Sequence, residues 1–304
     1  MHNGPILWSM SLGGGASGGR LRSAGEGVAT QEIFIPESSE TALDLLSQHG
    51  SDVFIMGGGT VGMALIGEGA VSPPLIMSLS RAKLNGVRRT DGRLEIGATT
   101  SLSRVAQLID PPLLATAARH VGGWAIRNMA TLAGNLFVPP PAGDAAVALL
   151  ALDAEVVAAS KGSTRVIPLA QFFKGRAQTA LAPHELVVRI DVPRSAGTSA
   201  FLKFGRRLMN TPAVVTVAAR VVRDDRGMCT DARIALGAAG DHPLRVMQAE
   251  AALRGRTLDS TSIEDAAAEA VRTVRPHGDA LASEWFRRRM VGVYVRRALH
   301  LIGG

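Results

Sequence analysis

The chain has 304 residues, of which 46% are hydrophobic and 19% charged, a composition typical of a globular protein whose length favours two domains. Its single cysteine, Cys229, excludes an internal disulfide and an iron–sulfur cluster held by this chain alone, since such a cluster needs about four thiolates. The net charge of +7 is compatible with an anionic cofactor or an acidic partner, but an aromatic content of 4% argues against nucleic-acid binding.

The first 30 residues are rich in Gly, Ser and Ala and lack a periodic apolar face. We therefore expect residues 1–30 to be a flexible extension. The apolar run at residues 6–8 is too short for a signal peptide, and the run at 145–152 is far short of the roughly 18 residues of a membrane span. The sequence predicts a cytoplasmic protein without a membrane span.

Residues 31–195 mix strand and helix signals, which predicts an α+β domain. The expected strands and hairpins are 33–35, 53–56, 75–79, 87–96, 155–167 and 185–192. The expected helices begin near 42, 102, 113 and 144.

A composition shift at residues 194–199 predicts a linker, followed by a second domain over residues 199–304. Its strand-like runs are 200–204, 213–223 and 232–238, and its helical segments are 245–253, 263–274 and 281–301. We expect a three-stranded antiparallel sheet packed on helices. Within the last helix, Arg287, Arg288 and Arg289 are predicted to form a solvated or partner-facing edge.

A glycine-rich run, Gly57 to Gly62, directly follows the buried strand 53–56. Glycines let a backbone approach a ligand closely and leave its N–H groups free for oxyanions, so the run fits a phosphate or pyrophosphate cradle. It is neither a Walker loop nor a Rossmann fingerprint. A plain tight turn explains the same residues, and both interpretations stay open at this point.

Thr131 and Asn135 stand on either side of small residues in the segment 126–135, Ile-Arg-Asn-Met-Ala-Thr-Leu-Ala-Gly-Asn. A hydroxyl and a carboxamide there could orient polar ligand atoms, or the segment could be an ordinary turn. Asp144 is predicted to be either the N-cap of the helix that follows or a carboxylate that binds ribose hydroxyls. The histidines show no metal-ligand spacing, so we expect no metal site.

Together these motifs resemble the flavoprotein (medium) subunit of molybdenum hydroxylases of the xanthine dehydrogenase and carbon monoxide dehydrogenase type. The segments that carry the resemblance are 55–60, 126–136, Asp144 with 149–154, and the Lys-x-x-Arg-Arg stretch beginning at Lys203. The resemblance covers about residues 31–300. It implies that residues 31–195 form an FAD-binding domain of the vanillyl-alcohol-oxidase (PCMH) type, and that residues 199–304 form the family's flavoprotein C-terminal domain.

By the same resemblance, the glycine run and the segment 131–135 hold the FAD pyrophosphate, Asp144 lies near the ribose, and Lys203 lies close to the flavin or its adenine. The cofactor-binding residues that we predict on this basis are Met56, Gly57, Gly58, Gly59, Thr60, Val61, Gly62, Thr131, Ala133, Gly134, Asn135, Asp144, Val187 and Lys203. No residue of this chain is predicted to be catalytic in its own right. The family commonly has Gly at position 133, and the methyl group of Ala133 is tolerated there if φ is negative.

The resemblance further implies an oxidoreductase subunit that is active only in a complex. A small subunit with [2Fe–2S] clusters and a large subunit with molybdopterin are the expected partners, arranged as a dimer of heterotrimers. Electrons would pass from the iron–sulfur subunit through FAD to NAD, a quinone or oxygen. Two alternatives remain on sequence grounds: a stand-alone PCMH-type flavin oxidase, and a non-catalytic nucleotide-binding module.

Overall fold

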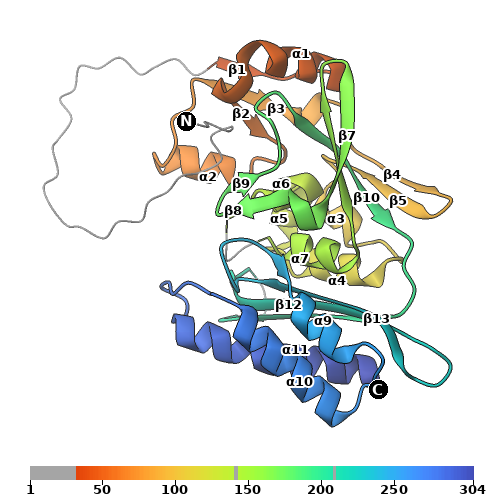
Figure 1. Cartoon of the computed structure of the whole chain (residues 1–304). Coiled ribbons are helices and arrows are strands. Elements are labelled where there is room, and N and C mark those ends of the chain that lie inside the picture. The colour runs from red at the N-terminus through yellow and green to blue at the C-terminus, as the bar shows by residue number, and fades with distance from the viewer. Residues whose placement is uncertain (1–31, 140–142, 208–209) are drawn as a thin grey trace, which may run out of the picture.

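The computed structural model describes residues 32–139, 143–207 and 210–304. The predicted extension at residues 1–30 and the proline-rich stretch at 140–142 lie outside these residues. Figure 1 shows an upper part that mixes strands and helices, and a lower part in which long helices lie beneath a sheet. Two hydrophobic clusters are present, one in the upper part and one between the lower sheet and its helices.

The upper part begins with a small parallel sheet in the order β1-β3-β2. Its strands are β1 (Glu32–Phe34), β2 (Val53–Met56) and β3 (Leu75–Ser78), with α1 (Ser39–His49) between the first two and α2 (Gly62–Gly67) after the second. Ser38 is the N-cap of α1, because its side chain accepts from the Thr41 N–H at 3.1 Å. Short 3₁₀ turns at Gly50–Asp52 and Leu79–Arg81 complete this region.

The second sheet of the upper part has five antiparallel strands in the order β4-β5-β10-β6-β7. Its strands are β4 (Val87–Thr90), β5 (Arg93–Gly97), β6 (Glu155–Ser160), β7 (Ser163–Pro168) and β10 (Leu186–Pro193). Both predicted hairpins are therefore confirmed. A two-stranded ribbon of β8 (Phe173–Gly175) and β9 (Gln178–Thr179) follows α8 (Leu169–Phe172).

Five short helices lie between β5 and β6 in the chain and include the segment 126–135 and Asp144. They are α3 (Leu102–Val105), α4 (Pro112–Arg119), α5 (Trp124–Met129), α6 (Leu132–Leu136) and α7 (Asp144–Ala151). Every residue of α7 is buried, which agrees with its apolar sequence on all faces. Helix α7 lies against the lower sheet and so joins the two parts of the molecule (Figure 1).

The lower sheet has four strands, not the three expected, in the order β11-β12-β13-β14. They are β11 (Thr198–Gly205), β12 (Ala213–Arg223), β13 (Cys229–Gly237) and β14 (Leu244–Arg245). The additional strand β14 has two residues and pairs with Ala235 and Leu236 of β13. Such a short strand has no periodicity of its own, which is why the sequence pattern assigned its last residue to the following helix.

Three helices cover the lower face of this sheet: α9 (Met247–Leu253), α10 (Ser260–Thr273) and α11 (Glu284–Gly303). Strand β12 is buried on both faces. Its residues Val215, Val217 and Ala219 face these helices, whereas Ala218 belongs to the upper cluster with α7. Successive side chains of a strand point to opposite faces, and Thr216 and Arg220 are each two residues from Ala218. Both polar side chains therefore point toward α7.

Candidate functional site: a cofactor cavity between the two domains

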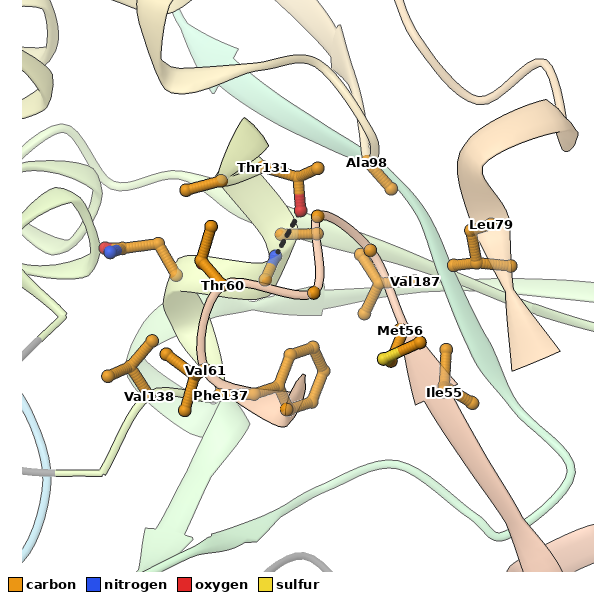
Figure 2. A pocket seen from close by; sticks show the side chains of 18 of the residues that line it. Ile55, Met56, Thr60, Val61, Leu79, Ala98, Thr131, Phe137, Val138 and Val187 are labelled. Carbon is orange, nitrogen blue, oxygen red and sulfur yellow. Dashed lines mark hydrogen bonds between the residues drawn. The ribbon is translucent and has the colours of Figure 1, made fainter. Parts of the chain in front are cut away.

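A cavity of about 390 Å³ opens between the glycine run, helices α5 to α7 and strand β11. All fourteen residues predicted from the sequence line it, from Met56 in the upper part to Lys203 in the lower part. Figure 2 shows side chains of Thr60, Val61, Thr131, Phe137 and Val138 surrounding this space. Segments far apart in the chain therefore meet at one place.

The glycine run makes the loop between β2 and α2, and it packs directly on the second motif. A Cβ on Gly57 would lie 2.6 Å from the Thr131 Oγ1 atom, and a Cβ on Gly58 would lie 1.8 Å from the carbonyl oxygen of Met129. Gly59 has φ of +70°, a conformation that favours glycine. Close packing on the Thr131 side chain and on the Met129 backbone explains Gly57 and Gly58, and all six residues of the run line the cavity.

The second motif turns between α5 and α6 at Thr131, which is the N-cap of α6. Its hydroxyl oxygen accepts from the Gly134 N–H at 3.1 Å, and both residues line the cavity. Ala133 lies inside α6 and has negative φ, so its methyl group is tolerated as the sequence required. Asn135 has 5% exposure, and its side-chain Oδ1 accepts from the Ala145 N–H at 2.9 Å. The carboxamide oxygen thus caps the first turn of α7, and Asn135 also lines the cavity.

Asp144 is the first residue of α7 and not its N-cap, which is Gly143 with φ of +93°. The predicted capping role is wrong, because the Asp144 side chain makes no cap hydrogen bond. Its Oδ2 instead accepts from Lys203 Nζ at 2.6 Å, and its Oδ1 accepts from the Thr216 hydroxyl at 2.8 Å. The carboxylate is therefore held by two strands of the C-terminal sheet.

The Asp144–Lys203 ion pair is buried, with 5% and 7% of the two side chains exposed. Lys203 Nζ also donates to the carbonyl oxygen of His120 at 3.1 Å. Removing both charges from water costs free energy unless hydrogen bonds compensate for it. Here the Lys203 ammonium donates to two oxygens, and the Asp144 carboxylate accepts from two donors. The pair ties β11 to α7 and fixes a cation at the wall of the cavity.

Glu185 is a lining residue that sequence reasoning did not single out. Its carboxylate accepts two hydrogen bonds from the Arg165 guanidinium, at 2.6 and 2.7 Å, and one from the Ala182 N–H at 2.7 Å. The bond from Arg165 is the main reason why the pKa of Glu185 lies below its usual value. Its negative charge is thereby retained at the cavity edge.

Sequence reasoning also missed Thr216, although the pattern of its strand indicates a buried polar contact. The run 213–223 is apolar except for Thr216, Arg220 and the terminal Arg223. Two polar residues four apart in a buried strand point to one face, and polar groups there need partners. Thr216 does not itself line the cavity. The lining residues outside the sequence motifs are mostly apolar, for example Val121, Phe137, Val138, Leu181 and Pro212.

The described residues contain no group of three His, Cys, Asp or Glu side chains that could hold a metal ion. Cys229 is buried, and burial raises the pKa of its thiol. Within the part of the chain that the structure describes, no helix has the length and apolar character needed to cross a membrane.

Comparison with known proteins identifies the family. Residues 28–195 match the family described as the FAD binding domain in molybdopterin dehydrogenase. Residues 199–302 match the CO dehydrogenase flavoprotein C-terminal domain. The chain belongs to this family of molybdenum hydroxylase flavoproteins. The resemblance stated from the sequence is thus confirmed, and so is the expectation of an FAD-binding oxidoreductase subunit.

Named relatives are subunits of dehydrogenases. The alpha subunit of the 6-hydroxypseudooxynicotine dehydrogenase complex of Paenarthrobacter nicotinovorans is 33% identical, over 88% of this chain and 94% of the relative. The FAD-subunit of nicotinate dehydrogenase of Eubacterium barkeri is 34% identical, over 77% and 82% of the two chains. Among solved structures, a chain of carbon monoxide dehydrogenase from Hydrogenophaga pseudoflava has a TM-score of 0.85 at 28% identity, covering 90% of this chain and 96% of that one.

Proposed function

We propose that the cavity binds FAD and that the chain is the electron-transfer subunit of a heteromeric molybdenum hydroxylase. The observation that carries this proposal is the meeting of two glycine-bearing bends and the Lys203–Asp144 pair around one cavity. The domains that we propose are an FAD-binding PCMH-type domain over residues 31–195 and a C-terminal domain over residues 199–304.

The fit of FAD rests on the chemistry of the walls. Backbone amides of the glycine run and of the turn at Thr131 would supply donors for a diphosphate. Gly58 allows the two bends to pack together, because a Cβ there would collide with the Met129 carbonyl. Apolar side chains such as Val121, Phe137 and Val187 suit planar rings. Lys203 would supply a cation for a carbonyl oxygen of the flavin or a ring nitrogen of the adenine. Asp144 holds that cation and remains close enough to the cavity to face a ribityl or ribose hydroxyl.

When bound, FAD accepts single electrons and releases two together to NAD, a quinone or oxygen. The chain's own contribution is to hold the cofactor by its diphosphate, to keep Lys203 fixed, and to exclude water with apolar walls. With Cys229 alone and buried, the chain has no ligands for a cluster. We therefore propose that a separate [2Fe–2S] subunit supplies the electrons and that a molybdopterin subunit oxidises the substrate, within a dimer of heterotrimers.

The test compares FAD, FMN and riboflavin as ligands of the full chain, using quenching of flavin fluorescence. If the two bends hold a diphosphate, FAD should bind at least about 100-fold more tightly than riboflavin, because charge-assisted bonds to the phosphates are lost in riboflavin. Equal affinity for the three flavins would refute the diphosphate cradle. Absence of any FAD binding would refute the proposed function as a whole.

A further inference from the structure

Three residues form a row across the lower sheet at the start of helix α7. Lys203 of β11 is directly opposite Thr216 of β12, and Thr216 is directly opposite Gly237 of β13. Side chains of directly opposite residues lie on the same face of a sheet. Both polar side chains of the row bind Asp144, which is the first residue of α7. The row therefore joins the sheet to the helix end that lies at the cavity.

Gly237 lets the helix come close to this row. A Cβ at position 237 would lie 2.7 Å from the Val147 Cγ2 atom and 3.3 Å from the Thr216 Cβ atom. Val147 follows Asp144 by three residues, so the two side chains lie on the same face of α7. The close packing at Gly237 and the hydrogen bonds to Asp144 thus hold one face of the helix on the sheet.

The two oxygens of the Asp144 carboxylate have different partners. Its Oδ1 accepts from the Thr216 hydroxyl at 2.8 Å, and its Oδ2 accepts from Lys203 Nζ at 2.6 Å. Thr216 is 1% exposed, so water does not compete for its hydroxyl. Branching at Cβ makes a threonine side chain stiff about χ1, which keeps the hydroxyl in place. A carboxylate held at Oδ1 cannot turn without breaking a buried hydrogen bond, and this fixes the position of Oδ2.

The Lys203 ammonium has three N–H donors, and two of them have partners among the described residues. These partners are Asp144 Oδ2 and the carbonyl oxygen of His120, the latter at 3.1 Å. Because the angles between the N–H bonds of an ammonium are fixed, two hydrogen bonds set the direction of the third N–H. Lys203 and Asp144 line the cavity, whereas Thr216 does not. The orientation of the ammonium therefore depends on a residue outside the cavity wall.

We propose that Thr216 is a positioning residue for the cofactor. Its hydroxyl orients the Asp144 carboxylate, which holds the Lys203 ammonium with its third N–H directed at an acceptor atom of the bound flavin nucleotide. This inference rests on the proposed function, in which FAD occupies the cavity. It assigns an effect on FAD affinity to a side chain that does not touch FAD.

The experiment measures the dissociation constant of FAD for the full chain by quenching of flavin fluorescence. Thr216→Val removes the hydroxyl and keeps the branched shape, whereas Thr216→Ser keeps the hydroxyl. Ser262→Ala is the matched control, because the Ser262 hydroxyl is also buried in the C-terminal domain and hydrogen-bonded, but Ser262 does not line the cavity. Circular dichroism and urea unfolding establish that each variant is folded.

Thr216→Val should weaken FAD binding at least about tenfold, because a hydrogen bond to a charged group is lost. Thr216→Ser should stay within about threefold of the wild type, and Ser262→Ala within about twofold although its stability falls. If Thr216→Val does not fold, Thr216→Ala tests the same hydroxyl and should show the same loss. Wild-type affinity in the chain that lacks the hydroxyl would overturn the proposal, and so would failure of Thr216→Ser to restore binding.

A second measurement separates positioning from a general loss of structure. In a Lys203→Met chain the ammonium is absent, so adding Thr216→Val should change FAD affinity by no more than about twofold. An equal loss with and without Lys203 would mean that the hydroxyl does not act through the ammonium, and would also overturn the proposal. A wild-type chain that binds no FAD would instead contradict the proposed function.

Discussion

The two ends of helix α7 each bring an aspartate to the C-terminal sheet, but with different surroundings. At the start of the helix, Asp144 meets Lys203 and Thr216 beside the cavity, in a buried setting. Just past its end, Asp153 is 34% exposed and accepts from three guanidinium groups, those of Arg220, Arg233 and Arg245. Asp153 does not line the cavity.

The spacing of the two sites follows from elementary geometry. The seven steps from Asp144 to Ala151 span about 10 Å at a helical rise of about 1.5 Å, to which the turn to Asp153 is added, and the four steps from Thr216 to Arg220 span about 13 Å at a strand rise of about 3.3 Å. Strand β12 thus meets both ends of α7. We propose that the ion pair at the first end presents a cation to the cofactor, whereas the ion pairs at the second end only join α7 to the lower sheet.

Removing the buried carboxylate should have the largest effect. Asp144→Ala leaves the Lys203 charge buried without its partner, so the free energy of unfolding should fall by about 3–5 kcal/mol, with loss of FAD. Urea unfolding measures the change. The double variant Asp144→Ala/Lys203→Met should recover part of the stability but not the FAD affinity. Full recovery of FAD binding would show that the pair is only structural.

Filling the contact between the two bends should come next. Gly58→Val places side-chain atoms where the Met129 carbonyl lies, which should cost about 3 kcal/mol and abolish FAD binding. FAD-to-protein ratio and circular dichroism report the two effects. Gly67→Ala at the end of α2 is the control, because a Cβ there meets no atom within 4 Å. A Gly58→Val protein with normal FAD content would contradict the close packing of the bends.

Neutralising the other aspartate should separate the two ends of α7. Asp153→Asn keeps a side chain that tolerates the positive φ of 51° but removes the charge that faces three arginines. The free energy of unfolding should fall by about 2 kcal/mol, as expected for lost charged hydrogen bonds. FAD affinity, measured on the folded protein, should stay within about twofold of wild type. A large loss of FAD affinity would mean that both ends serve the cofactor.

The smallest effect concerns pH and the cavity edge. The pKa of Glu185 is lowered in the folded state by Arg165, so the carboxylate stabilises the protein above its unfolded value of 4.5 and this contribution is lost as pH falls through the lower folded value. Because Arg165 is half exposed, the contribution is about 0.5–1 kcal/mol. Unfolding of wild type and Glu185→Gln should therefore differ at pH 7 and converge in acid. A constant difference would exclude this ion pair as its cause.

Local patterns in the sequence accounted for much of the architecture. Strand β12 was predicted with its observed bounds, and both hairpins of the upper sheet followed from alternation around turn residues. The segments that line the cavity were also recognisable, because a glycine run after a strand and the small residues around Thr131 are contiguous in the chain. The boundaries of single helices were less accurate, since helix ends depend on caps supplied from elsewhere.

Arg287 shows where local patterns fail. It stands in a run of three arginines and was expected at a solvated or partner-facing edge, but it is 1% exposed. Its guanidinium donates to the carbonyl oxygens of Ala213 and Val214 and to Asp279. This prediction was wrong for Arg287 because its partners lie on β12 and in the loop before α11. No spacing within the run distinguishes it from its exposed neighbour Arg289.

The sequence by itself determined the family, the FAD-binding assignment and most strands, because each strand and each motif is a short contiguous segment that can be recognised without knowing the fold. Only the tertiary structure decided which partners the buried charges have. It joined Asp144 to Lys203 and Thr216, used Asn135 to cap α7, and added β14 to the lower sheet. The physical reason is that a buried charge or amide is satisfied by whichever group the fold brings within hydrogen-bond distance, and periodicity along a chain does not specify that group.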